Sequence, residues 1–280
     1  VLKQSIDLLI KSSGKNDPDL ITYYASLASA FGGFGNEMLQ LKWYKRALDV
    51  AANHFGKESV EYANLAFDAA TNVFRQSTSP AGEKYLRQSL AVYEKAFGAS
   101  SHEAGMANYW LGRFQFYRRD NRDAVQYLLD ALTAFEGETE SEKAQRLLIR
   151  VLLVQSYEEL DESDNATRHC VAIGRESQFA SNQEIVPLFR LVPQYPHSQL
   201  RNGVEGHVVL SFTVDESGFV RDPEVIEEVV GGRSSGWNSV HSGFRDKKEH
   251  RSFSAAALAA VERYRYAPRF VAGVAVPAED

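Results

Sequence analysis

The sequence has few of the features that would indicate a disulfide-linked, membrane-spanning or polyanion-binding protein. Its 280 residues include a single cysteine, Cys170, so no disulfide can form within the chain. No uninterrupted apolar run reaches the roughly 18 residues that a membrane-spanning helix needs, and residues 1–14 lack the layout of a signal peptide. A formal net charge of −6 argues against a broadly basic nucleic-acid-binding protein, so we expect no nucleic-acid partner.

Proline is scarce in the first 180 residues, which hold only two of the eight prolines, Pro18 and Pro80. The other six lie in residues 181–280. Because a helix interior excludes proline, this distribution predicts a helical first part and a second part of a different kind. The remaining composition, 44% hydrophobic and 24% charged, is typical of a globular protein rather than of a disordered chain.

A repeat of 42 residues runs through the first part of the chain. The recurring positions are Gly14, Gly56 and Gly98; Trp43, Tyr85 and Tyr127; and Leu27, Ala69, Leu111 and Leu153. Each copy contains two stretches with the i, i+3, i+4, i+7 apolar spacing of an amphipathic helix, such as the stretch from Ala107 to Phe114. A fixed period of this length indicates stacked helix pairs.

In its third copy the repeat resembles the tetratricopeptide repeat (TPR), in the longer form found in kinesin light chains. The residues at the expected offsets of that motif are Leu111, Gly112, Ala124, Tyr127, Ala131 and Leu132. The resemblance covers residues 1–178 and implies an all-α superhelix, to which we assign residues 1–180. Because Ile6 lies 42 residues before Leu48, the register predicts that the array starts in the middle of a repeat.

Stacked helix pairs form a concave groove that usually binds peptides or proteins. Five residues on the first helices of the repeats are candidates to line this groove: Tyr23, Tyr24, Asn64, Tyr109 and Arg113. The alternative for the aromatic residues is that they pack between the helices. The sequence names no ligand, so we expect an unidentified protein or peptide as the partner.

Residues 181–280 show the pattern of a small α+β domain with the order β-β-α-β. Alternating apolar residues predict a strand over 205–215 and a returning strand over 219–230, joined by a turn. An alanine-rich segment predicts a helix over 252–264, and residues 270–276 are a candidate third strand. The fold class is therefore α+β overall, with an all-α array followed by a small α+β domain.

This segment resembles the C-terminal domain of the TonB family of energy transducers. The matching residues come in order: Pro193-Gln194-Tyr195-Pro196; Gly203-Val204-Glu205-Gly206; Phe212-Thr213-Val214-Asp215 with Gly218 and Val220; Ala256-Ala257-Leu258 with Ala260-Val261; and Tyr264-Arg265-Tyr266-Ala267-Pro268 with Gly273. The resemblance implies a periplasmic domain that binds the TonB-box peptide of an outer-membrane transporter. It also implies that this domain transmits force from an inner-membrane, proton-driven motor.

The resemblance also places the contacts with the receptor peptide. The candidates are Arg190, Gln194, Tyr195, Pro196, Val274 and Val276. The alternative for Tyr195 and Pro196 is that they only cap the sheet. No catalysis is needed, because an edge strand can add an extended peptide through its unpaired backbone groups.

Two features depart from the family pattern. Residues 231–251 are longer than the usual link between the second strand and the helix, and the glycine and serine in them predict a surface loop. The chain stops at Asp280, where relatives continue into the edge strand on which the peptide is added. We therefore expect that the natural chain extends beyond both ends. A membrane tether or secretion signal, and the contact with the motor proteins, would lie in the absent part.

Residues 232–236, Gly-Arg-Ser-Ser-Gly, satisfy the G-x-S-x-G pattern of a hydrolase nucleophile elbow. The segment is too small for the α/β sheet that such an elbow needs. The seven histidines have no metal-ligand spacing, and His169 and Cys170 occupy core positions of the repeat. We therefore expect no catalytic residue, no metal and no cofactor.

The sequence thus predicts a TonB-like energy transducer of the periplasm that is not an enzyme, with TPRs that recruit a protein partner. The alternative is a periplasmic TPR scaffold or cell-envelope adaptor whose TonB-like domain binds proteins without transmitting force.

Overall fold

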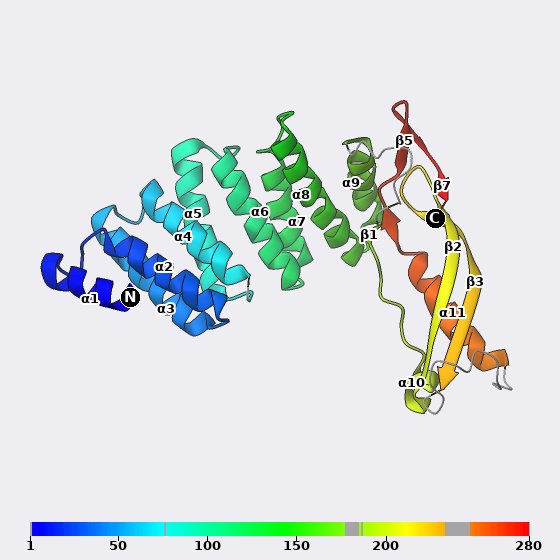
Figure 1. The fold of residues 1–280 in the computed structure, drawn as a ribbon. Helices are drawn as coiled ribbons and strands as arrows, with labels where there is room; N and C mark the ends of the chain where they lie inside the picture. Colours follow the sequence, from blue (N-terminus) through cyan, green and yellow to red (C-terminus); the bar gives the residue numbers. More distant parts are fainter. Residues whose placement is uncertain (1, 76, 177–184, 186, 233–246, 280) are drawn as a thin grey trace. The chain divides into compact units, whose positions relative to one another are not determined.

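The computed structural model describes residues 2–75, 77–176, 185, 187–232 and 247–279. Packing divides the chain into two compact units (Figure 1): Val1–Ser156, which we call the helical unit, and Tyr157–Asp280, which we call the sheet unit. Each unit has a hydrophobic core of its own.

The helical unit is built from antiparallel helix pairs. Its helices are α1 (Leu2–Ser13), α2 (Leu20–Gly33), α3 (Glu37–His54), α4 (Val60–Phe74), α5 (Pro80–Phe97), α6 (His102–Tyr117), α7 (Asn121–Leu132) and α8 (Glu140–Glu159), the end of which belongs to the sheet unit. Helix α2 packs on α3, α4 on α5 and α6 on α7, and the pairs meet through α3 with α4 and α5 with α6. The stacked helix pairs predicted from the repeat are therefore confirmed.

Local sequence signals set the ends of these helices. Ser59 and Ser101, which are 42 residues apart, each accept a hydrogen bond from the backbone N–H three residues later, at the starts of α4 and α6. Gly56 and Gly98, also in register, have φ of +86° and +97° just after α3 and α5. A side chain would strain the backbone there, which explains why the repeat keeps glycine at these positions.

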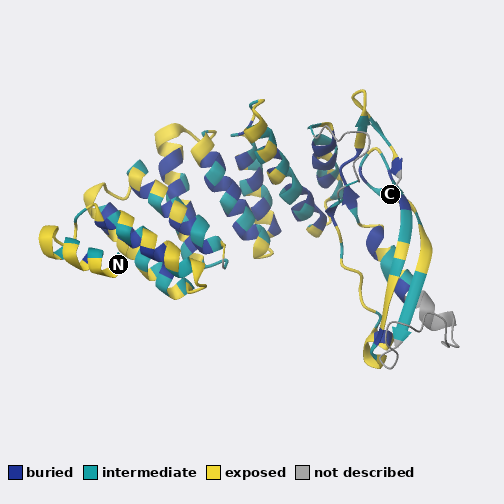
Figure 2. Cartoon of the chain, in the orientation of Figure 1, coloured by how far each residue is buried: buried dark blue, intermediate teal, exposed yellow. Residues whose placement is uncertain are grey.

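The buried positions of these helices face their neighbours (Figure 2), and most of them hold alanine, leucine, valine or aromatic residues. The repeat positions Leu27, Ala69 and Leu111 are at most 7% exposed. At Gly112 a Cβ atom would lie only 2.6 Å from Cγ of Leu128, so α6 and α7 approach each other closely. The apolar positions Leu27, Ala69 and Leu111 of the 42-residue pattern therefore pack between neighbouring helices.

The sheet unit combines the end of α8 with α9 (Ser163–Glu176) and a mixed segment. That segment contains β1 (Pro187–Phe189), α10 (His197–Asn202), β2 (Val204–Val214), β3 (Val220–Gly232), α11 (Lys247–Val261), β4 (Arg265–Tyr266), β5 (Arg269–Val271), β6 (Val274–Val276) and β7 (Ala278–Glu279). Strands β2 and β3 form a long antiparallel hairpin, and β7 joins it in the order β3-β2-β7. Helix α11 packs on both long strands, over a core that includes Phe212, Val220 and Val261.

The predicted strand, strand and helix are present, but the candidate third strand at 270–276 forms a separate hairpin. Strand β5 pairs with β6, and their turn residues Ala272 and Gly273 have φ of +51° and +80°. Two successive positive φ values make a tight turn that folds the chain back on itself. The third strand of the main sheet is instead β7, which begins only at Ala278, opposite Val214. Apolar alternation alone does not distinguish one continuous strand from a short hairpin.

The packing boundary after Ser156 differs from the sequence boundary expected at residue 180. The last repeat helix, α9, lies in the sheet unit and packs on β5 and β6. The end of the repeat pattern marks a change of composition, whereas the packing boundary marks which residues share contacts. The two criteria therefore divide this chain at different positions.

Candidate functional site

The groove candidates divide into packed and accessible side chains. Tyr24 and Tyr109 are only 5% and 7% exposed, and Tyr23 packs against the core of the first helices. Burial raises the pKa of Tyr109, although the neighbouring Arg113 acts in the opposite direction. Asn64 is exposed and Arg113 is half-buried. The three tyrosines therefore serve mainly in helix packing, and the two polar residues are the accessible ones.

Arg113 on α6 lies against a group of aromatic rings. Its guanidinium carbon is 4.7 Å from the ring centroid of Trp110, 5.3 Å from that of Phe74 and 5.5 Å from that of Tyr109. The ring of Phe74 also contacts that of Tyr117, with 5.6 Å between centroids, and Tyr117 is 58% exposed. We call these five residues the aromatic–arginine cluster. Cation–π contacts of this kind hold a guanidinium in a fixed place.

Sequence reasoning named Tyr109 and Arg113 of this cluster and missed the other three residues. A local signal was available for one of them, because Tyr109, Arg113 and Tyr117 are spaced four residues apart and so share a helix face. Phe74 comes from the preceding first helix, α4, and reaches the cluster only through tertiary packing.

Asn64 on α4 is held by a contact with α5. Its Oδ1 accepts a hydrogen bond from the hydroxyl of Tyr93 at 2.8 Å. Burial, with the nearby charges of Asp68 and Glu103, raises the pKa of Tyr93 to about 12. The hydroxyl therefore stays protonated well into the alkaline range, and its hydrogen bond fixes the orientation of Asn64.

A hollow of about 520 Å³ runs along α5, lined by Pro80, Glu83, Lys84, Arg87, Gln88 and Ala91. Beside it, Glu83 accepts hydrogen bonds from Arg87 at 2.7 Å, Gln115 at 3.1 Å and Arg118 at 2.9 Å. Arg87 also donates to the hydroxyl of Tyr127. These contacts join α5, α6 and α7, so Glu83 and Arg87 are occupied within the helical unit.

The first segment of receptor-peptide candidates lies beside the start of β2. The hydroxyl of Tyr195 donates to the backbone carbonyl of Val204, and its ring meets that of Phe253 edge-on, with 5.5 Å between centroids. The guanidinium of Arg190 lies 5.8 Å from the ring of Tyr264, Gln194 is exposed, and Pro196 precedes α10. Tyr195 thus makes the contacts of a cap on the sheet, while its 44% exposure leaves part of the ring accessible.

The second segment of candidates lies toward the other end of β2 (Figure 1). Val274 and Val276 are on β6, which pairs with β5 and precedes β7, the partner of Val214. Val274 is 64% exposed and Val276 is half-buried. Since Tyr195 contacts Val204 and β7 contacts Val214, the two groups of candidates are not brought together.

The outer edge of β3 carries features that oppose pairing with a further strand. Pro223 has no N–H to donate, and Asp222, with φ of +48°, interrupts the extended backbone. Glu224 and Glu227 are exposed along the same strand. Proline and charge are common means of protecting an edge strand.

The outer edge of β2 lacks these features along most of its length. Within the described residues only β7 pairs with this edge, at Thr213 and Val214. From Glu205 to Phe212, β3 pairs with one edge of β2, and no strand of the described part pairs with the other edge. Strand β2 therefore presents backbone groups that an added strand could pair with.

The serine motif weighed for chemistry lies outside the described part, and the histidine and cysteine assigned to core positions are buried. Ser234 and Ser235 of the G-x-S-x-G motif lie outside the described residues. Cys170 is fully buried, and burial raises the pKa of its thiol to about 11. His169 stacks on Tyr157, with 5.8 Å between ring centroids. Among the residues that the structure describes, no group of three or more His, Cys, Asp or Glu could hold a metal ion, and no helix has the length and apolarity needed to cross a bilayer.

Comparison with known proteins identifies the fold of the helices. No protein-family model matches the chain, and no curated protein matches it. The chain is similar to the crystal structure of BtubC (BKLC) from P. vanneervenii, with a TM-score of 0.51 and 19% identity over 64% of this chain and 73% of that chain. It is also similar to the nearly identical TPR-like repeats of a kinesin light chain-type protein from Podosopora anserina, with a TM-score of 0.50 and 15% identity over 59% of this chain and 80% of that chain.

Neither similarity supports the resemblance of residues 181–280 to the TonB family, which stays a prediction. At such identities a similar structure is informative about the fold alone. The part of the chain that these structures match therefore has a TPR-like repeat fold.

Proposed function

We propose that the helical unit binds a peptide segment of a partner protein at the aromatic–arginine cluster. The observation that carries this proposal is the exposed ring of Tyr117, which contacts Phe74, one of the three aromatic rings that hold the guanidinium of Arg113 in place. Aromatic and arginine side chains dominate binding energy at protein interfaces. A fixed guanidinium also pairs well with a carboxylate. The expected segment therefore combines an apolar anchor with an acidic residue.

Selection from a library of short random peptides tests this proposal on the whole chain. Peptides that bind the unchanged protein should bind Arg113→Ala and Tyr117→Ala at least about tenfold more weakly, as expected for interface anchors. Phe34→Ala is the matched control, because Phe34 is 86% exposed just after α2 and lies outside the cluster. Selected peptides that bind both variants as tightly as the unchanged protein would contradict the proposal.

A second proposal concerns the sheet unit, which we infer adds an extended peptide as a strand on the outer edge of β2. The contrast between the two edges of the hairpin supports it. The edge strand β3 has Pro223 and exposed acidic residues, whereas the outer edge of β2 from Glu205 to Phe212 pairs with no strand of the described residues. Strand addition is also the binding mode that the TonB resemblance implies, but there the peptide joins the last strand of the sheet rather than β2.

The finer form of this proposal is energy transduction in the periplasm. Its partners would be the TonB-box peptide of an outer-membrane transporter and inner-membrane motor proteins that engage a segment outside this chain. A periplasmic scaffold or cell-envelope adaptor that binds peptides without transmitting force is the alternative. Residues 181–280 carry the resemblance, and the TPR-like repeats are compatible with either role.

Calorimetric titration with synthetic TonB-box peptides tests the second proposal. Binding should weaken when Gln194 and Tyr195 are both changed to alanine, because Tyr195 contacts β2 at Val204. The control is Glu227→Ala on the protected strand β3, which should bind as the unchanged chain does. An absence of heat with peptides from several receptors would rule out the transducer. Binding that persists in the double variant would place the peptide elsewhere.

A further inference from the structure

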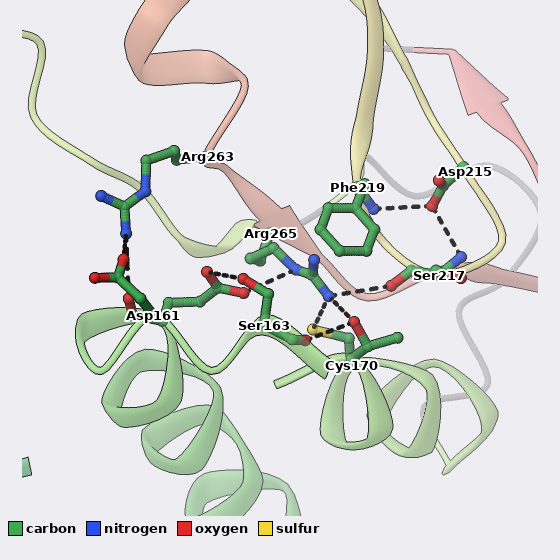
Figure 3. A network of polar contacts seen from close by, with 10 residues as sticks. Asp161, Ser163, Cys170, Asp215, Ser217, Phe219, Arg263 and Arg265 are labelled. Carbon is green, nitrogen blue, oxygen red and sulfur yellow. Dashed lines mark hydrogen bonds and ion pairs between the residues drawn. The ribbon is translucent and has the colours of Figure 1, made fainter. Parts of the chain in front are cut away.

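A buried arginine connects three elements of the sheet unit (Figure 3). Arg265 on β4 is only 1% exposed. Its Nη2 donates to Oγ1 of Thr167 on α9 at 2.6 Å and approaches the carbonyl of Ser217, in the turn between β2 and β3, at 3.4 Å. Its Nε lies 3.4 Å from Oε1 of Glu158, in the last turn of α8, and the Glu158 side chain is 3% exposed. One guanidinium therefore contacts two repeat helices and the tip of the hairpin.

The guanidinium is also enclosed by less polar groups. Its central carbon lies 3.4 Å from the ring centroid of Phe219, and Nη2 lies 3.8 Å from Sγ of Cys170 on α9. An arginine can stack flat on an aromatic face while its edge donates hydrogen bonds, which lysine cannot do. The shape of this site therefore fits a guanidinium in particular.

The surfaces around Arg265 meet without space for an added methyl group. Gly218, with φ of +85°, lies so close to β4 that a Cβ atom would be 2.1 Å from the carbonyl oxygen of Tyr266 and 3.4 Å from Cβ of Cys170. On the next turn of α9, a Cβ atom on Gly174 would be 2.3 Å from the carbonyl oxygen of Pro268. Helix α9 thus packs directly on the backbone of the segment that follows β4.

The charge of Glu158 is held by further contacts at the end of α8. Its Oε2 accepts a hydrogen bond from Ser163, the first residue of α9, at 3.0 Å. Outside this buried pair, Arg263 donates to the carboxylate of Asp161 at 2.9 Å, and Asp161 is 84% exposed. Glu158, at the end of α8, is therefore a buried acidic partner for Arg265, and Asp161, between α8 and α9, is an exposed acidic partner for Arg263.

We propose that Arg265 joins α9 and the β2–β3 hairpin into one cooperatively folding unit, in which the sheet segment covers the last repeat helix in place of a further repeat. The end of a repeat array needs such a cover, because each repeat buries its apolar face only against a neighbour. Removing one member of a buried ion pair leaves the other charge without compensation, so both sides of the contact should open together. This inference is independent of the peptide-binding proposals.

Hydrogen exchange on the whole chain, followed by mass spectrometry, tests the proposal. In Arg265→Leu the amides of α9 and of the β2–β3 hairpin should both exchange faster, by the same factor of about a hundred or more. Helices α2 to α6 should exchange as in the unchanged protein. The matched control is Arg263→Leu, which removes an arginine two positions earlier that donates to the exposed Asp161 and to the backbone carbonyl of Glu158, at 3.2 Å, but not to the Glu158 carboxylate. It should change exchange by less than about fivefold.

Milder variants keep the test decisive if Arg265→Leu does not fold. Arg265→Lys retains the charge and loses the flat stack on Phe219, and Thr167→Val removes one acceptor with little change of shape. Each should accelerate exchange in α9 and in the hairpin by a common factor of about ten. Faster exchange in the hairpin with unchanged protection of α9 would overturn the proposal. So would factors that differ more than severalfold between the two segments.

Discussion

The helical unit and the sheet unit are stabilised in different ways. In the helical unit, apolar residues recur every 42 positions, and the equivalent positions Leu27, Ala69 and Leu111 are all buried. In the sheet unit, the buried guanidinium of Arg265 contacts Glu158 of α8, Thr167 of α9 and Ser217 in the turn of the hairpin. Loss of one repeat contact should therefore have a limited effect, whereas loss of the arginine site should affect every element around it.

Glycine substitutions give the sharpest form of this comparison. Gly218→Ala in the sheet unit would place Cβ 2.1 Å from the backbone oxygen of Tyr266, at a φ of +85°, and should lower the free energy of unfolding by about 4 kcal/mol. Gly112→Ala in the helical unit would meet mainly the side chain of Leu128, at 2.6 Å, and should cost about 2 kcal/mol. Hydrogen exchange in each unit measures the two values, and equal losses would contradict the difference.

Removal of a repeat core residue should remain confined to the helical unit. Leu111 is fully buried in a cluster with Ala70 and Leu86, so Leu111→Ala should lower the stability of the helical unit by about 3 kcal/mol. The loss should be visible as faster exchange in α4 to α7. The conservative control Leu111→Met should cost less than about 1.5 kcal/mol. An equally large loss of protection in β2 and β3 would show that the units unfold together.

The same contrast explains how much of the fold could be predicted from the sequence. The helix pairs were predictable because their signal is local and repeated, as Ser59, Ser101, Gly56 and Gly98 show. The β2–β3 hairpin was predictable from alternation and from its turn glycine. The hairpin of β5 and β6 was not, because its alternating apolar residues are equally compatible with one strand, and the turn at Ala272 and Gly273 decides between them.

The candidate sites were predictable only in part, for a related reason. Asn64 and Arg113 lie at accessible positions, while Tyr24 and Tyr109 are buried, and the sequence left both alternatives open for the tyrosines. The buried contacts of Arg265 could not be predicted, because its partners are distant in sequence. Thr167 lies 98 residues earlier and Ser217 lies 48 residues earlier. No local pattern contains such a contact.

Alkaline pH should destabilise the two units over different pH ranges, because the pKa values of their buried groups differ. Burial, partly offset by Arg265, raises the pKa of the Cys170 thiol from 9.0 to about 11. The unfolded chain then releases a proton that the folded chain keeps, so the sheet unit should lose stability as pH rises from about 9 to 11, by at most about 1.4 kcal/mol per pH unit. In the helical unit Tyr93, with its pKa raised from 10.0 to about 12, should cause a loss that starts one pH unit higher.

Two variants identify the groups responsible for these losses. Cys170→Ala should flatten the decline of the sheet unit between pH 9 and 10, and Tyr93→Phe should flatten that of the helical unit above pH 10. Chemical denaturation across this pH range, followed by exchange in each unit, gives both profiles. An unchanged slope in Cys170→Ala would show that the thiol does not govern the response of the sheet unit.

The smallest effect should come from the exposed counterpart of the buried ion pair. Asp161 is 84% exposed and lies 2.9 Å from Arg263, whereas Glu158, three residues earlier, is 3% exposed and faces Arg265. Asp161→Asn retains a side chain that tolerates the observed φ of +57°, so the substitution isolates the charge. Thermal unfolding should show a loss below about 1 kcal/mol that disappears in high salt, because solvent screens an exposed pair. Glu158→Gln should cost several times more and keep that cost in salt, since its partner is buried. Similar salt dependence in the two variants would mean that burial does not distinguish the two arginine contacts.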